Sequence, residues 1–316
     1  MRAADSVKAL MTGSDPAAGV AGDPGRRQQD LERILAGQTD TAASRRSPAL
    51  LRRPRLLVPL GGLAAAASAV LVFGLLPGST AGTAYAATPP PLQYTAVETS
   101  LPAGQLLEGI AQHTAALSEP TGEDTVLEWK DWSLFTRIDG ETVSSRVVAA
   151  DHKAVVHADG SGTLTSAFEG EDAKTEAYGP DLYREPMPTD PTLLRESLRR
   201  STPAIDAASG TDQALRGVLR SQALDPAQRA AVLRLIAGLP ELRYEGSVTD
   251  RAGRSGQAFS ADSDGSGLPT RYTFIIEAAT GRVLGQEAML TTRAGKLNVP
   301  VPSVISYTVY LDAHKQ

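Results

Sequence analysis

The chain has 316 residues, no cysteine, 31 Lys and Arg residues and 36 Asp and Glu residues. The lack of cysteine excludes disulfides, thiolate nucleophiles and cysteine-ligated zinc within this sequence. Residues 1–55 hold ten basic and six acidic residues, whereas the remainder holds 21 basic and 30 acidic ones. The acidic C-terminal part argues against nucleic acid or anionic lipid headgroups as its partners.

The first 55 residues are expected to form a mostly disordered tail. Residues 1–25 are rich in Ala, Gly, Asp and Pro, a composition that does not build a core. Residues 30–36 (DLERILA) favour a short helix that stops at Gly37. Because so short a helix is unstable alone in water, the tail has a cytoplasmic protein or the membrane surface as its candidate partner.

The run from Leu56 to Leu76 reads LLVPLGGLAAAASAVLVFGLL and contains no charged residue, Asn or Gln. A helix over this run would be about 31 Å long, close to the hydrocarbon thickness of a bilayer. The segment therefore predicts one transmembrane helix, and the chain meets the lipid bilayer through Leu56 to Leu76. A buried helix of a soluble domain is the alternative, although such helices usually carry a polar face.

Positive charge sets the predicted orientation of this helix. Five arginines lie between residues 45 and 55, and no Lys or Arg follows the span until Lys130. Positive charge next to a span stays on the cytoplasmic side, so we expect a single-pass protein of the cell membrane with a cytoplasmic N-terminus and an extracytoplasmic C-terminal domain. A secretory signal cleaved at Ala84-Tyr85-Ala86 is a second alternative.

A Gly, Ser, Thr and Pro-rich stalk is expected over residues 77–93, followed by an extracytoplasmic domain over residues 94–316. This domain opens with an Ala-rich helix at residues 102–117. In residues 125–138 the apolar positions change parity around Lys130-Asp131, which favours a bulge or bend in a strand.

Short strands follow in the sequence pattern. Tight turns are expected at Asp139-Gly140 and Asp159-Gly160. The strands that these turns separate are predicted at about residues 141–150, 153–158 and 162–169.

The middle of the domain is expected to be helical. One helix begins at Asp190-Pro191, and its inward-facing residues are Leu193, Leu194 and Leu198. Thr211 is a candidate cap for a second helix. A third helix begins at Asp225, where Gln228 completes a capping box.

The final third of the chain is again predicted to form strands. A turn at Thr280-Gly281 leads into a strand over residues 283–291. The last strand is expected to place one set of side chains on one face: Ile305, Tyr307, Val309 and Leu311. Strands, helices and then strands, with hairpin-length links, predict an α+β fold with a curved antiparallel sheet covered by helices.

Several segments resemble an uncharacterised family of single-pass, membrane-anchored proteins from high-GC Gram-positive bacteria. These segments are DLERILAG in the tail, TDPTLL, DPAQRAAVLRLIAGLPEL, GSVTDRAGRSGQAFS and FIIEAATGRVLGQE. Members are often encoded beside extracytoplasmic-function sigma factors, which implies a role in envelope signalling. More distantly, the element order is similar to the half-barrel fold of lipoprotein carriers and sigma-regulatory sensors, which hold acyl chains or peptides in an apolar groove.

One departure from related proteins concerns zinc. Zinc-type anti-sigma domains use His and a Cys pair in their cytoplasmic part, whereas residues 1–55 contain neither His nor Cys. If this tail binds and inhibits a sigma factor, it therefore does so without a zinc site of that kind.

Candidate metal sites are weak throughout the sequence. His152 and His157 are five residues apart, and an odd offset within one strand would point them to opposite faces. The remaining histidines, His113 and His314, stand alone. The segment from Asp262 to Gly267 resembles the start of a calcium loop but lacks the closing Glu, so a hairpin loop is favoured.

Catalytic signatures are also missing from the sequence. Arg251 and Arg254 lie in a predicted turn and could bind a phosphate or a carboxylate. Glu169, Glu171 and Asp172 fall in a polar loop, and no nucleophile elbow, Walker A loop, dinucleotide fingerprint or zincin helix is present. We therefore expect no catalytic, cofactor-binding or metal site and a protein that is not an enzyme.

The aromatic residues of the C-terminal domain are expected to be mostly core, with some lining a groove for an apolar ligand if the helices cover the sheet incompletely. The leading hypothesis is an envelope sensor or regulator whose tail meets a cytoplasmic partner and whose ectodomain binds a ligand or protein. A tethered carrier or scaffold for lipids or lipoproteins is the alternative, and an unrecognised hydrolase is third.

Overall fold

The computed structural model describes residues 86–118, 122–140, 142–181 and 185–316. The strands are β1 (Tyr94–Thr95), β2 (Thr125–Asp139), β3 (Thr142–Val156), β4 (Gly162–Phe168), β5 (Lys174–Tyr178), β6 (Arg243–Thr249), β7 (Ser255–Ser263), β8 (Thr270–Ile276), β9 (Val283–Leu290) and β10 (Ser303–Lys315). The helices are α3 (Ala103–Ala115), α4 (Pro191–Ser201), α5 (Ala208–Leu219) and α6 (Pro226–Ala237).

The predicted tail, the span from Leu56 to Leu76 and residues 77–85 of the stalk lie outside the described residues. Within the described ranges, no helix combines the length and the apolarity that a bilayer crossing requires.

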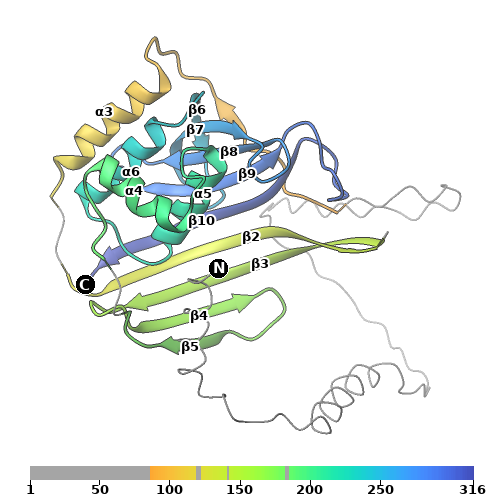
Figure 1. The fold of residues 1–316 in the computed structure, drawn as a ribbon, viewed down its shortest axis with the longest axis horizontal. Coiled ribbons are helices and arrows are strands. Elements are labelled where there is room, and N and C mark those ends of the chain that lie inside the picture. The colour runs from red at the N-terminus through yellow and green to blue at the C-terminus, as the bar shows by residue number, and fades with distance from the viewer. Residues whose placement is uncertain (1–85, 119–121, 141, 182–184) are drawn as a thin grey trace, which may run out of the picture. The chain divides into compact units, whose positions relative to one another are not determined.

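The described strands form one antiparallel sheet in the order β1-β6-β7-β8-β9-β10-β2-β3-β4-β5 (Figure 1). Two meanders, β2–β5 and β6–β10, are joined because the last strand, β10, pairs with β2. The helices come from the segment between the meanders, apart from α3, which precedes them. This arrangement confirms the predicted α+β fold with a curved antiparallel sheet.

The helices cover the β6–β10 part of the sheet and leave the β3–β5 part uncovered (Figure 1). Helix α6 is central, since it packs against α3, α4 and α5. Its cap matches the prediction: the Asp225 carboxylate accepts a hydrogen bond from the Gln228 N–H at 2.8 Å, and the Gln228 side chain accepts one from the Asp225 N–H at 3.0 Å. The helix is apolar nearly all round, as expected for one buried on several sides, with buried Ala230, Ala231, Val232, Leu233, Leu235 and Ile236.

The main core lies between α6 and the helix-facing side of the sheet. Phe259 and Phe274 of β7 and β8 are fully buried there. A second, small cluster lies on the outer side of the sheet and consists of Val248, Ala258, Ile275 and Leu284. Leu92 and Tyr94 pack against it, so the segment before β1 covers part of the outer face.

Strands β2 and β3 each correct a prediction. Strand β3 is one continuous strand, not two, because its pairing with β2 continues without a shift through Ala150 and Asp151. The parity change in β2 is likewise not a bulge in that strand. Trp129 belongs to the main core, whereas Trp132 stacks on Tyr307 on the opposite face, and the irregularity lies in β10 instead.

Three side chains lie elsewhere than predicted. Leu193 is 56% exposed, since α4 packs inward through Leu194, which points in a different direction around the helix. Thr211 lies inside α5, and its hydroxyl donates to the Ile205 carbonyl at 2.6 Å rather than capping the helix. Ile305 packs against the main core while Tyr307 lies on the outer face, because the pairing of β10 with β9 shifts between Val304 and Ser306.

The burial of Phe274 makes a direct stability prediction. Phe274→Ala removes a fully buried ring and leaves a cavity, so the free energy of unfolding should fall by about 3–5 kcal/mol in urea titrations. Phe135→Ala is the matched control, because this ring is 53% exposed and its loss should change the free energy by about 0.5 kcal/mol or less. Equal effects of the two substitutions would contradict the assignment of the core.

Candidate functional site

A groove of about 930 Å³ opens where the helix layer ends and the sheet continues. Its floor is the helix-facing side of β2, β3 and β4, and one wall is the segment that follows α5. The other wall is the chain that leaves β5. Lining residues are Trp129, Asp131, His152, Ala154, Val156, Gly160, Leu164, Tyr178, Gly179, Pro180, Asp181, Glu185, Arg220, Ser221 and Gln222.

The floor of the groove carries a cross-strand aromatic stack. Trp129 of β2 lies directly opposite His152 of β3, and their rings stack with centroids 4.9 Å apart. The Phe168 ring of β4 meets the His152 ring edge-on at 6.2 Å. Residues that face each other across antiparallel strands share one side of the sheet, so the strand register alone brings these rings together.

A polar corner closes the groove beside the stack. Asp131 accepts hydrogen bonds from the Trp129 indole N–H at 3.0 Å and from the Thr308 hydroxyl at 2.7 Å. It also forms an ion pair with Arg220, whose Nη2 donates to the Thr308 hydroxyl as well, at 2.8 Å. Arg220 Nε is buried and has no hydrogen-bond partner among the described residues, so the guanidinium has unused donor capacity at the wall of the groove.

The polar corner continues as a network beneath α5. Arg216 donates to the Thr308 hydroxyl at 2.5 Å and pairs with Asp212 at 2.9 Å. Asp212 in turn accepts from the Gln286 side-chain amide at 2.9 Å, and the Gln286 carbonyl oxygen accepts from the Tyr310 hydroxyl at 2.5 Å. Burial raises the pKa of Tyr310 well above its usual range, so this hydroxyl stays a donor.

This network fixes the position of the groove wall. Asp212, Arg216 and Arg220 are four residues apart and therefore lie on one face of α5 and the turn after it. Removing one partner of a buried ion pair is strongly destabilising, because the other charge is left unpaired away from water. The C-terminal end of α5 is therefore held in one place against β10 and β2.

The histidines do not gather into a metal site. His152 lies in the groove, and its Nδ1 lies 2.9 Å from the Ser166 hydroxyl. His157 lies beyond the end of β3 and pairs with Asp124, whereas His314 pairs with Asp312. The described part of the chain holds no group of three or more His, Asp and Glu side chains placed to share a metal ion.

Ser166, His152 and Asp131 line up across three strands, an order that resembles a hydrolase triad. The His152 Nε2 to Asp131 contact is 3.5 Å, however, and Asp131 already accepts three other hydrogen bonds. Ser166 lies within β4, which pairs with strands on both sides, so backbone N–H groups near it are used by the sheet. Backbone N–H groups that take part in sheet hydrogen bonds are not available to stabilise an oxyanion.

The other predicted positions have structural partners. Asp262 lies at the end of β7, not in the following loop, and pairs with Arg243 and Arg271. Arg251 binds the buried carboxylate of Glu287 at 2.5 Å. Burial raises the pKa of Glu287, although Arg251 opposes this effect.

Arg254 also takes an internal role. It pairs with Asp250 at 2.7 Å and donates to the main-chain carbonyls of Tyr310 and Leu284 at 2.8 and 2.9 Å. These carbonyls belong to β10 and β9, whose pairing ends at Val309 and Gly285. Arg254 thus bridges the two strands where they separate.

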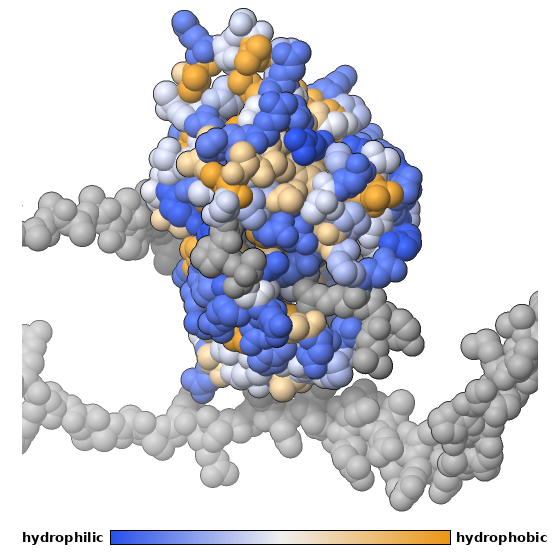
Figure 2. Space-filling model, turned by 90° about the vertical axis from the view of Figure 1, so that its left-hand side faces the viewer, coloured by the Kyte–Doolittle hydropathy of each residue, from blue (hydrophilic) through white to orange (hydrophobic). Residues whose placement is uncertain are grey.

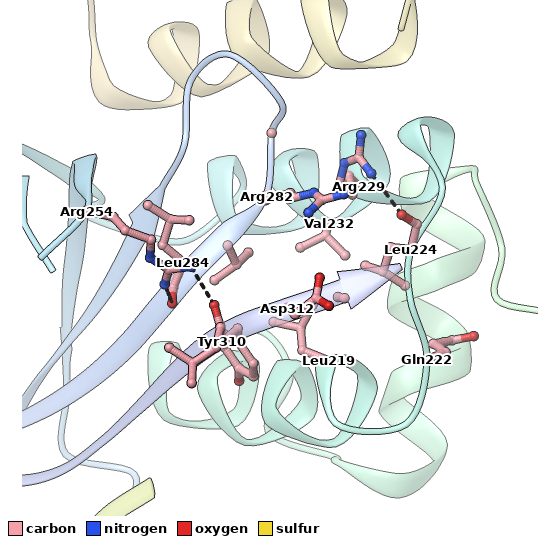
Figure 3. A pocket seen from close by; sticks show the side chains of 14 residues that line it. Leu219, Gln222, Leu224, Arg229, Val232, Arg254, Arg282, Leu284, Tyr310 and Asp312 are labelled. Carbon is pink, nitrogen blue, oxygen red and sulfur yellow. Dashed lines mark hydrogen bonds between the residues drawn. The ribbon is translucent and has the colours of Figure 1, made fainter. Parts of the chain in front are cut away.

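A second cavity of about 60 Å³ adjoins this separation, between α5, α6 and the ends of β9 and β10 (Figure 3). Leu219, Val232 and Tyr310 line it in Figure 3, together with Arg254. Its volume suits a few water molecules and is far below the 300–1,000 Å³ of typical small-molecule sites. A hollow of about 900 Å³ beside Leu117 and Pro226 matches the groove in volume. The groove on β2–β4 is the candidate functional site because it combines an aromatic stack with the Asp131–Arg220 ion pair.

Known proteins offer little guidance for this chain. No protein-family model matches it, and no curated protein matches it either. A putative outer membrane lipoprotein-sorting protein domain from Vibrio parahaemolyticus is 10% identical, with 67% of this chain and 93% of that chain covered and a TM-score of 0.20. A DUF1329 family protein from Desulfovibrio piger is 11% identical, with 67% and 91% covered and a TM-score of 0.20. TM-scores this low do not establish a shared fold or a shared function.

The partly buried histidine of the groove, His152, predicts an effect of pH on stability. Burial lowers the pKa of His152 below 6.5 and the Arg220 cation adds to this, although Asp131 opposes it. The unfolded chain therefore binds more protons just below pH 6.5, and this site loses stability as the pH falls through that window. The melting temperature of the wild type should drop more between pH 7.5 and 5.5 than that of His152→Gln. His113→Gln, at an exposed position on α3, should behave like the wild type.

Proposed function

We propose that residues 86–316 form a non-enzymatic binding domain that holds an amphipathic, lipid-like ligand in the groove on β2–β4. The observation that supports this most strongly is the groove itself, a hollow of about 930 Å³ on the part of the sheet that the helices leave uncovered. Its size is within the range of sites for small organic molecules.

The chemistry of the lining suits a ligand with an apolar chain and a polar end. Val156, Leu164 and Trp129 offer an apolar floor. Asp131 and Arg220 offer a charged corner at one side of the groove. Burying a chain on the floor gains about 25 cal/mol per Å² of apolar surface, and the corner orients the polar end.

The proposal includes a membrane tether. The uncharged run from Leu56 to Leu76, with five arginines on its N-terminal side, supports a single transmembrane helix with a cytoplasmic N-terminus. In this arrangement the groove lies outside the cytoplasm, close to the membrane that supplies lipid-like ligands. The domain is then a tethered carrier or scaffold.

A sensor is the second proposal, because the same chain joins the groove to a tail with a short amphipathic segment at residues 30–36. A tail of this kind would report ligand binding to a cytoplasmic partner. Deletion of residues 1–40 should alter transcription that depends on an extracytoplasmic-function sigma factor if the sensor proposal holds. A deletion that leaves this transcription unchanged supports the carrier instead.

Displacement of a fluorescent fatty acid tests the groove. Leu164→Glu places a carboxylate on the apolar floor and should weaken binding at least about tenfold, or about 1.4 kcal/mol. Leu193→Glu is the control, since this exposed leucine of α4 is not part of the lining, and it should leave the affinity within about twofold.

Two results would count against the proposal. Equal affinities of the Leu164→Glu and Leu193→Glu variants would place the fatty acid outside the groove. Turnover of a p-nitrophenyl ester that disappears in Ser166→Ala would show that the domain is an enzyme after all.

A further inference from the structure

The hairpin of β2 and β3 continues past the rest of the sheet as a two-stranded arm, defined here as residues 134–140 and 142–148 (Figure 1). Strand β10 pairs with β2 only as far as Ser133, and β4 pairs with β3 only from Ala150. Among the residues that the structure describes, no strand therefore lies beside either edge of the arm. Two-stranded hairpins are at best marginally stable alone in water, so the arm gains from a contact outside the sheet.

The arm exposes apolar side chains on both of its faces. Phe135 is 53% exposed on one face, and Ile138 and Val147 are 48% and 38% exposed on the other. Two arginines accompany them, because Arg146 lies over the Phe135 ring at 5.4 Å and Arg137 follows two residues after Phe135. Apolar side chains flanked by arginines are typical of segments that lie in the interfacial region of a bilayer.

The loop between β9 and β10, residues 291–302, lies against the arm. Ser145 of the arm donates a hydrogen bond to the Leu297 carbonyl at 3.0 Å. The loop adds the exposed Val301 and two more basic residues, Arg293 and Lys296.

Charge distinguishes this end of the domain from the rest. The sequence of the arm and the loop contains four basic residues and two acidic ones, whereas residues 86–316 as a whole contain 21 basic and 30 acidic residues. The arm and the loop together therefore have a net positive charge, although the domain as a whole is acidic. The face at the other end, which carries α3 and the C-terminus, is mostly hydrophilic with scattered apolar residues (Figure 2).

The start of the described chain lies at the same loop. The Ala86 N–H donates to the Asn298 carbonyl at 3.2 Å, one residue from the contact between the loop and the arm. Leu76, the end of the proposed membrane span, stands ten positions before Ala86, with nine residues between them. Even fully extended, ten residues reach about 35 Å at most.

We propose that the arm and the adjoining loop rest on the outer surface of the membrane that the chain crosses. Phe135, Ile138 and Val147 enter the interfacial region, and the arginines meet anionic lipid headgroups. The connection from the proposed span joins the domain at this basic end, since Ala86 is hydrogen-bonded to the loop beside the arm. This inference rests on the proposed membrane tether.

The chain contains no cysteine, so one introduced cysteine carries a single label. The full-length Ile138→Cys variant, labelled with the dye NBD, is reconstituted into liposomes of phosphatidylcholine and phosphatidylglycerol. Its emission should shift to the blue, and lipids that carry a nitroxide should quench most of it. The Leu193→Cys variant is the control, because Leu193 is similarly exposed but lies on α4, and its label should show neither effect.

The outcomes separate the tether from the arm. Full-length protein that does not float with the liposomes after an alkaline wash would contradict the tether. Protein that floats but shows equally weak quenching at positions 138 and 193 would contradict the arm proposal.

The double substitution Arg137→Glu and Arg146→Glu tests the role of anionic headgroups. It should reduce the quenching at position 138, and unchanged quenching would overturn that role. A blue shift that grows with protein density and ignores the quencher would indicate contact between two copies, which also overturns the proposal.

Discussion

The ion pair between Arg220 and Asp131 is the contact on which the candidate site depends. It joins the end of α5 to β2 at the point where the helix layer stops. Thr308 of β10 links the same two residues to Arg216, so a charged network connects the helix layer with three strands of the sheet. Because such groups are costly to bury unless all are paired, the network favours one position of the helix over others. That position leaves the floor of β2–β4 open.

The two uncovered parts of the domain belong to the same hairpin. The groove lies on β2 and β3 near Trp129 and His152, and the arm is the continuation of these strands beyond Ser133. The proposed ligand site and the proposed membrane contact are thus joined by continuous backbone hydrogen bonding. The β2–β3 hairpin would thus contact both a lipid-like ligand and the bilayer that supplies it. This continuity supports the carrier proposal.

Local sequence signals predicted most helices and turns, because caps and tight turns depend on neighbouring residues. The capping box at Asp225 and the hairpin at Asp139-Gly140 are both present, and Gly140 has the positive φ of 59° that such a turn requires. Long-range pairing was less predictable. Strand β3 looked like two strands because its middle is polar, although pairing with β2 holds it together.

The groove could not be located from the sequence, since its residues come from separate segments that only the strand register brings together. One signal was present: Asp212, Arg216 and Arg220 recur every four residues along α5 and the turn after it, and the inner side of this helix is otherwise mostly apolar. A charged row of this kind on a buried face indicates a partner across the interface. The partners Asp131 and Thr308 are distant in sequence, so their identity required the fold.

Hydrogen–deuterium exchange with and without a bound fatty acid tests whether the ligand lies in the groove on β2–β4. It reports the location of the ligand without any substitution. Bound fatty acid should slow exchange in β3, β4 and the turn after α5, and it should leave exchange unchanged in β7 and β8, whose helix-facing side is filled by the core. Protection of β7, β8 and α6 with no change in β3 and β4 would contradict this prediction, since the ligand would then bind beneath the helices and not in the groove.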